Sequence, residues 1–297
     1  MKLLIQNYTS SISSKPIYLD HAIRSSACGE SFLWNMGSIS AYDVMDGFQP
    51  DAVLVHASGL NRDIVKYVTS QKSTPLVVDI TGATQEAVRN LETQFYNLNV
   101  PVKCFLSESV KCLNTVKTER YKLFHLPPGF DVFLGKDASV PKFNLDGCVI
   151  GRIDSHSTRE SVKGFETYHK ILVRDSNGLG NRENFDIEAN VMFLTSLYGR
   201  YGETILNGDL KYIFSQLFFD STMSSTKVSL NYPFEQKADF MEVLKCLFED
   251  TGSEPSIGYI KDQIKKSHTC VDRCSQLLSE LGDSEAAKQV LKLKEAL

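Results

Sequence analysis

A chain of 297 residues that is 42% hydrophobic and 23% charged can bury a substantial core and form two domains, which excludes a disordered protein. Its net charge of −4 gives no overall attraction for nucleic acid or for anionic lipid. No apolar run approaches the length of a membrane span, and the apolar segment at the N-terminus ends before Gln6, which is too short for the core of a signal peptide. The seven cysteines are scattered, as is typical of proteins in a reducing compartment. We therefore expect a cytoplasmic protein without stable membrane association.

Apolar strands alternate with amphipathic helices from the N-terminus to residue 132. Helices are expected from Pro16, after a cap at Asn61 or Asp63, and from Thr84. Such alternation predicts a parallel sheet with right-handed crossovers. The predicted domain is Rossmann-like and covers 1–132, with strands at 3–5, 51–56, 75–80, 102–107 and 121–126.

The alternation ends at Pro127-Pro128-Gly129, and a polar stretch at 135–141 follows. We place the domain boundary there, with a second α/β domain at 142–256. A further strand is expected at 191–194. From residue 257 to 297 the apolar spacing is helical, so we expect C-terminal helices that pack back on the domains.

A short apolar run at 148–150 predicts a buried strand that stops at Gly151. Arg152 then leaves the strand end, and Lys163 and Gly164 begin a segment, 165–172, whose apolar residues have helical spacing. Ligands of open α/β sheets bind outside the strand ends, and a helix N-terminus favours anions, so the two cations suit a diphosphate. A surface Arg and a surface Lys flanking an ordinary turn is an equally open interpretation.

The pattern Gly-Arg, loop, Lys-Gly after a strand resembles the donor-diphosphate site of GT-B glycosyltransferases. The resemblance implies an α/β fold with two Rossmann-like domains facing a central cleft and, in the retaining type, transfer with retention. It also implies that Arg152 and Lys163 are catalytic, because they neutralise the leaving nucleoside diphosphate. Gly151 and Gly164 would line the same donor site.

Three further sites follow from the resemblance. Asp220 matches the helix acid that binds the donor ribose, whereas the family's earlier acid falls on Tyr212 and is missing. Ser10 and Ser11 lie where the loop after the first strand approaches the donor. His56 ends a strand, as a histidine near the sugar does in many relatives, and is assigned a catalytic role. The alternatives are a solvent-facing Asp220 and a His56 satisfied by neighbouring backbone.

The function expected is transfer of a hexosyl or pentosyl group from a nucleotide sugar, which serves as co-substrate, to an acceptor hydroxyl. No cofactor and no metal are expected, since the chain contains no Asp-x-Asp. The acceptor is expected to extend to hydroxymethylated bases of phage DNA in a host cytoplasm, with Lys111 and Lys117 as nucleic-acid contacts. The alternative is a GT-B-like binding protein that has lost catalysis.

Overall fold

The structure is a computed structural model that describes residues 1–8, 15–35, 39–71, 73–133, 147–152, 165, 167–173, 187–189, 200–207, 216–225, 227–232, 234–248 and 256–296. Their contacts divide into two compact units. Unit 1 contains the described residues of 1–8, 15–127 and 270–297, and unit 2 contains those of 128–269. None of the described helices is long and apolar enough to cross a membrane.

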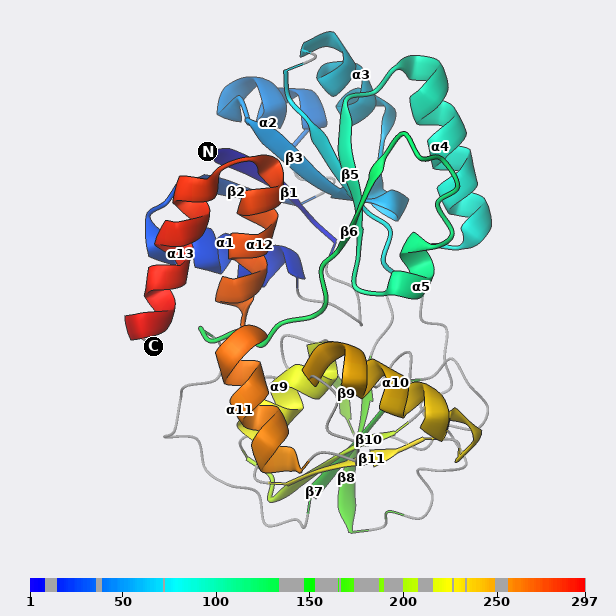
Figure 1. The fold of residues 1–297 in the computed structure, drawn as a ribbon, viewed down its shortest axis with the longest axis vertical. Helices are drawn as coiled ribbons and strands as arrows, with labels where there is room; N and C mark the ends of the chain where they lie inside the picture. The colour runs from blue at the N-terminus through cyan, green and yellow to red at the C-terminus, as the bar shows by residue number, and fades with distance from the viewer. Residues whose placement is uncertain are drawn as a thin grey trace. The chain divides into compact units, whose positions relative to one another are not determined.

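Unit 1 is built on a six-stranded sheet in the order β2-β1-β3-β4-β5-β6, and every neighbouring pair is parallel (Figure 1). The central strands are apolar because both faces of a parallel sheet are covered. Leu54 and Val77, for example, are fully buried. The strands are β1 (Lys2–Asn7), β2 (Glu30–Asn35), β3 (Ala52–His56), β4 (Leu76–Asp79), β5 (Val102–Ser107) and β6 (Lys122–His125).

The helices of unit 1 fall into two groups. Helix α1 (Lys15–Ser26) contacts α12 (Cys270–Leu281) and α13 (Ser284–Ala296), which lie beside it in Figure 1, so the end of the chain packs against its beginning. The second group packs into the core that contains β3 and β4. It comprises α2 (Ala41–Phe48), the 3-10 helix η1 (Ala57–Gly59), α3 (Arg62–Gln71), α4 (Gln85–Leu98) and α5 (Val110–Leu113).

Unit 2 contains a five-stranded parallel sheet in the order β11-β10-β7-β8-β9. Its core packs Ile150 and Leu206 of the sheet against Phe219 and Ile264 of the helices. The elements are β7 (Gly147–Arg152), β8 (Tyr168–Val173), β9 (Ile187–Ala189), β10 (Glu203–Asn207), α9 (Gln216–Ser224), β11 (Lys227–Asn231), η3 (Phe234–Gln236), α10 (Lys237–Phe248) and α11 (Ile257–Ser267).

These sheets confirm the predicted α/β class with two parallel sheets and a helical C-terminus. One local prediction is wrong, because 168–173 is a strand and not a helix. The segment pairs in parallel with β7 from Tyr168 to Val173, and its aromatic and β-branched residues favour that pairing. The strand expected at 191–194 lies outside the described residues.

Candidate functional site at the switch points of two sheets

Each sheet has one point at which the chain reverses the direction in which it adds strands. In unit 1, β1 is followed by β2 on one side and then by β3 on the other. In unit 2, β8 and β9 extend the sheet from one side of β7, and β10 and β11 extend it from the other. Ligands of open α/β sheets bind outside the carboxyl ends of the strands at such switch points. The candidate sites are therefore the carboxyl ends of β1 and β3 and those of β7 and β10.

At the carboxyl edge of unit 1, six polar residues form one network, which we call the edge cluster. They come from the ends of four adjacent strands and from the first residue of α1. Parallel strands bring their carboxyl ends to the same edge, so residues far apart in sequence meet there. The members are Tyr8, Lys15, His56, Asp79, Thr81 and Glu108.

Lys15 is the cation of the edge cluster. Its Nζ lies 2.7 Å from Asp79 Oδ2 and 3.1 Å from Glu108 Oε1, and the Lys15 and Asp79 side chains are fully buried. Burial alone would lower the pKa of Lys15, but attraction by Asp79 and Glu108 outweighs it and raises that pKa. Burial likewise would raise the pKa of Asp79, yet Lys15 and its hydrogen bonds lower it. The pair is therefore charged at neutral pH.

Asp79 accepts hydrogen bonds at both carboxylate oxygens. The Tyr8 hydroxyl donates to Oδ2 at 2.6 Å, while the Thr81 backbone N–H and hydroxyl donate to Oδ1 at 2.9 and 2.6 Å. The bond to the Thr81 N–H closes an Asx turn, and Gly82 follows with φ of 74°, a conformation that favours glycine. Burial and the neighbouring Asp79 raise the pKa of Tyr8 well above its usual value, so Tyr8 is a neutral donor.

His56 sits at the end of β3 with both ring nitrogens engaged. Nε2 lies 2.9 Å from the Thr81 carbonyl oxygen, which can only accept, so Nε2 carries the proton. Nδ1 accepts from the Ser58 N–H at 3.2 Å, which caps η1. The ring also packs against Tyr8, with centroids 4.9 Å apart. Both ring nitrogens of His56 thus form hydrogen bonds with neighbouring backbone, which was the alternative to a catalytic role. For His56 to transfer a proton, one of these hydrogen bonds would have to be replaced by one to the substrate.

The buried side-chain amide of Gln6 stabilises this turn with two hydrogen bonds. Gln6 Oε1 accepts from the His56 N–H at 3.0 Å, and Gln6 Nε2 donates to the Gly59 carbonyl at 2.7 Å. A Cβ on Gly59 would collide with the Gln6 carboxamide, so glycine is required for this close approach. The His56 backbone is thus fixed to β1 independently of its ring.

In unit 2, the switch point is the end of β7, where Gly151 is in register with Asn207 of β10. The strand β7 runs one residue past the stop predicted at Gly151, so Arg152 is its last residue, and the Arg152 backbone pairs with Val173 of β8. Asn207 is 5% exposed, and its Oδ1 accepts from Asn231 Nδ2 at 2.6 Å. Lys163, Gly164, Ser10 and Ser11 lie outside the described residues, and so does Tyr212.

Asp220 lies on α9, in the predicted succession of an acidic helix, a small-residue turn and a strand. It is not solvent-facing, since 2% of it is exposed. The turn after α9 is held by buried hydroxyls, with Thr204 Oγ1 2.7 Å from Ser225 Oγ. A ribose contact by Asp220 would require the carboxylate to become accessible.

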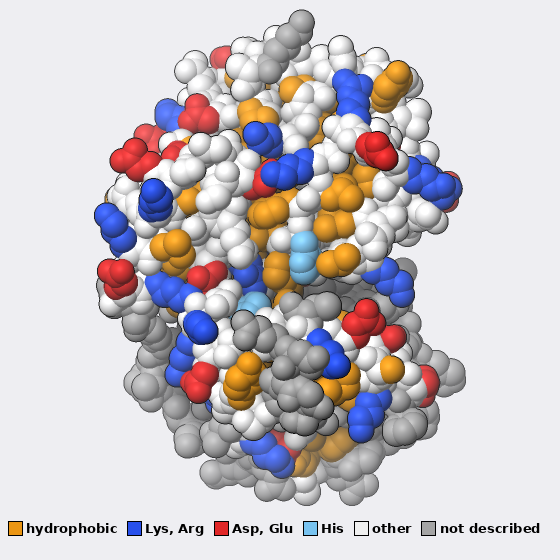
Figure 2. All heavy atoms as spheres, viewed as in Figure 1, with side chains coloured by type: hydrophobic (Ala, Val, Ile, Leu, Met, Phe, Trp, Pro, Cys, Tyr) orange, Lys and Arg blue, Asp and Glu red, His pale blue; other side chains and the backbone are white. Residues whose placement is uncertain are grey.

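The two lysines predicted to contact nucleic acid are both exposed. Lys111 lies on α5, and Lys117 lies on the following loop, where its N–H donates to Glu92 Oε1 at 3.2 Å. On the face drawn in Figure 2, the basic and acidic side chains of unit 1 are interspersed. The face drawn therefore gives little of the attraction that phosphates require.

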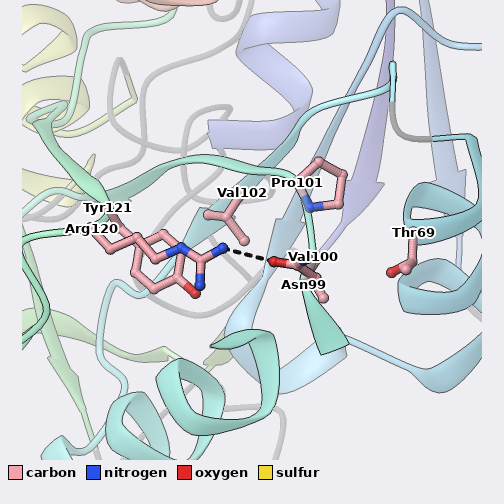
Figure 3. Close-up of a pocket in the computed structure, with 7 residues that line it drawn as sticks. All are labelled: Thr69, Asn99, Val100, Pro101, Val102, Arg120 and Tyr121. Atoms are coloured by element: carbon pink, nitrogen blue, oxygen red, sulfur yellow. Dashed lines mark hydrogen bonds between the residues drawn. The ribbon is translucent and has the colours of Figure 1, made fainter. Parts of the chain in front are cut away.

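A separate open pocket of about 550 Å³ lies at the opposite, amino edge of the unit 1 sheet, beside the start of β5 (Figure 3). Arg120 crosses it, donating to Asn99 Oδ1 at 2.9 Å with its guanidinium over the rings of Tyr96 and Tyr121. Because this pocket lies at the amino edge and the switch point at the carboxyl edge, the pocket is not part of the candidate site.

Among the described residues, no group of three or more His, Cys, Asp or Glu side chains is placed to hold a metal ion. Four residues of the candidate sites were not predicted from the sequence, and they are Lys15, Asp79, Glu108 and Asn207. A usable signal existed for three of them, because Asp79 and Asn207 end strands and Glu108 follows one. Lys15 gave no such signal, since a lysine before a helix-starting proline is ordinary.

The chain matches no protein-family model and no curated protein. Solved structures similar to it include AviGT4, a glycosyltransferase involved in avilamycin A biosynthesis, at 10% identity and TM-score 0.48, over 100% of this chain and 99% of that one. The spinosyn rhamnosyltransferase SpnG has 12% identity and TM-score 0.44, over 99% and 95%. An S. aureus MnaA-UDP co-structure has 10% identity and TM-score 0.46, over 98% and 94%. At such identities and scores we assign no activity from these likenesses.

Proposed function

We propose that the protein is a GT-B-type glycosyltransferase that moves a sugar from a nucleotide donor to an acceptor hydroxyl. The supporting observation is that Gly151-Arg152, the pair singled out by its resemblance to a donor-diphosphate site, ends β7 at the switch point of unit 2. A cation there suits a diphosphate. Arg152 and Lys163 would stabilise the charge on the leaving nucleoside diphosphate.

The test combines ligand binding and turnover. UDP, TDP, GDP and ADP are screened by thermal shift, and the matching nucleotide sugars by release of the nucleoside diphosphate. Arg152→Ala should reduce turnover on the order of 100-fold without lowering the melting temperature, because the charge acts on the transition state. Lys170→Ala, which removes a half-buried cation of β8 outside the switch point, is the matched control.

The outcomes separate the alternatives. Binding without turnover for any acceptor favours the binding-protein alternative, and no binding of any nucleoside diphosphate contradicts the proposal. Turnover should survive EDTA, since the proposed mechanism uses cations of the chain in place of a metal. A DNA acceptor would require binding that weakens with salt and that Lys111→Glu and Lys117→Glu reduce while donor binding is retained.

The edge cluster favours a second candidate reaction on the same donors. Two carboxylates, an ammonium and a phenol in one network are the groups that proton transfer at a sugar carbon would need. Against it, Lys15 and Asp79 are fully buried, so substrate would have to open the cluster. Incubation of the nucleotide sugars in D₂O discriminates the two: deuterium in the recovered sugar supports proton transfer, whereas release of nucleoside diphosphate supports glycosyl transfer.

A further inference from the structure

We infer that Lys15 is a positioning residue for His56, which it orients through Asp79 and Thr81. The route from Lys15 to the His56 ring runs through two residues. Lys15 forms an ion pair with Asp79, and Asp79 accepts a hydrogen bond from the Thr81 N–H. The Thr81 carbonyl in turn accepts a hydrogen bond from His56 Nε2. The chain of contacts is continuous and lies wholly within unit 1.

The first step fixes the direction of the Asp79 carboxylate. Oδ2 faces Lys15 Nζ at 2.7 Å, which turns Oδ1 toward the backbone N–H of Thr81 at 2.9 Å. The Thr81 hydroxyl adds a second donor to Oδ1 at 2.6 Å and accepts from the Glu108 N–H at 3.1 Å. Lys15 Nζ also lies 3.4 Å from that hydroxyl. Thr81 is thereby held from three sides.

The second step transmits this order to the imidazole. With Thr81 fixed, its carbonyl oxygen stands 2.9 Å from Nε2 and selects the tautomer protonated on Nε2. The Ser58 N–H selects the same tautomer by donating to Nδ1. Tyr8 holds the face of the ring, and its own hydroxyl is anchored on Asp79 Oδ2. Asp79 therefore controls His56 from two directions, and Lys15 supplies the charge that keeps Asp79 ionised and in place.

Removal of Lys15 should loosen this arrangement. Asp79 and Glu108 would then be two buried carboxylates without their shared cation, and such like-charged groups repel or take up a proton. Either change weakens the carboxylate as acceptor for Thr81. The bond from the Thr81 carbonyl to Nε2 loses its support, so the ring should exchange between its two tautomers.

The experiment is NMR of the full chain with ¹⁵N-labelled histidine, with the His56 signals assigned by their loss in His56→Gln. In the unmodified chain, Nε2 should appear as an N–H nitrogen and Nδ1 as an unprotonated one. In Lys15→Met, the ratio of the tautomers should fall by about fivefold or more, the factor that corresponds to one lost hydrogen bond. Lys122→Met, which breaks the ion pair between the mostly exposed Lys122 and Glu280, should leave the His56 signals unchanged.

Unchanged His56 signals in a folded Lys15→Met would overturn the inference, as would an Nδ1-protonated ring in the unmodified chain. If Lys15→Met does not fold, Thr81→Val decides, because it removes the hydroxyl bond to Asp79 and keeps the backbone carbonyl. A shifted tautomer ratio in Thr81→Val supports the inference, and an unchanged one contradicts it.

The use of His56 in catalysis rests on the proposed function, whereas its tautomer does not. Turnover of a nucleotide sugar is therefore a second readout of the same variants. A tautomer change without any turnover in the unmodified chain would leave the positioning role intact and count against the glycosyltransferase proposal.

Discussion

At the scale of single residues, the ion pair of Lys15 and Asp79 is fully buried in unit 1. Breaking a buried ion pair leaves an uncompensated charge, so Lys15→Met should destabilise unit 1 by about 3–5 kcal/mol at neutral pH. Urea unfolding measures the loss. Lys122→Met, at a pair whose lysine is mostly exposed, should cost clearly less. Equal losses in the two variants would contradict the assigned role of the buried pair.

The same pair sets a dependence of stability on pH. The pKa of Asp79 is lowered by folding, so its contribution is present above the unfolded pKa and is lost as pH falls through the folded one. The pKa of Lys15 is raised, so its contribution is present below the unfolded pKa and is lost as pH rises through the folded one. Asp79→Asn should reduce the acid-side loss, and urea midpoints from pH 7 to pH 3 would test it.

Gly59 lies where there is no room for a Cβ atom. A methyl group there would meet the Gln6 carboxamide, which is buried and bonded to the turn, so Gly59→Ala should cost about 1–3 kcal/mol. Gly47 in α2 has open space around its Cβ direction, and Gly47→Ala should be neutral or stabilise by about 0.4–1 kcal/mol. Comparison of the two urea midpoints checks the prediction, which a stable Gly59→Ala would contradict.

At the scale of elements, the sequence predicted most strands of unit 1 because they are short apolar runs bounded by polar turns. It did not predict β2, where three apolar residues stand between polar ends, or α2, whose eight residues include Gly47. The error at 168–173 has a different cause. Apolar residues at 165, 168, 171 and 172 match a helical period, but pairing with β7 determines the structure, and pairing cannot be read from local spacing.

Helix α4 allows a test of a local signal that was correct. Thr84 caps it by accepting the Ala87 N–H at 3.2 Å, so Thr84→Ala should cost about 1 kcal/mol. Thr93 lies inside the same helix and donates to the Arg89 carbonyl, where a hydroxyl gives no such benefit. Thr93→Ala should therefore be neutral or slightly stabilising. A smaller loss for Thr84→Ala than for Thr93→Ala in thermal unfolding would contradict the cap.

At the scale of the whole molecule, both sheets are parallel and each has a single switch point among its described strands. This explains which residues of the candidate sites could be predicted from the sequence. His56 and Arg152 end strands that are recognisable from apolar runs, so the strand-end rule found them. Lys15 required the strand order, because only the order places the start of α1 at the same edge as the ends of β4 and β5.

The two switch points also predict where a donor acts. A nucleoside diphosphate that binds at the ends of β7 and β10 should stabilise unit 2 by about 2.7 kcal/mol when its concentration is 100 times its dissociation constant. Unit 1 should be stabilised less. Amides of β7 and β10 that exchange through unfolding of unit 2 should then slow about 100-fold, whereas those of β3 and β4 should change much less. Hydrogen exchange read by mass spectrometry, with and without the diphosphate identified by thermal shift, measures both sets together. Arg152→Ala should abolish the difference, and Lys170→Ala should retain it. Protection from hydrogen exchange that is confined to β3 and β4 would indicate that the donor binds at the edge cluster of unit 1. It would contradict the proposed role of Arg152.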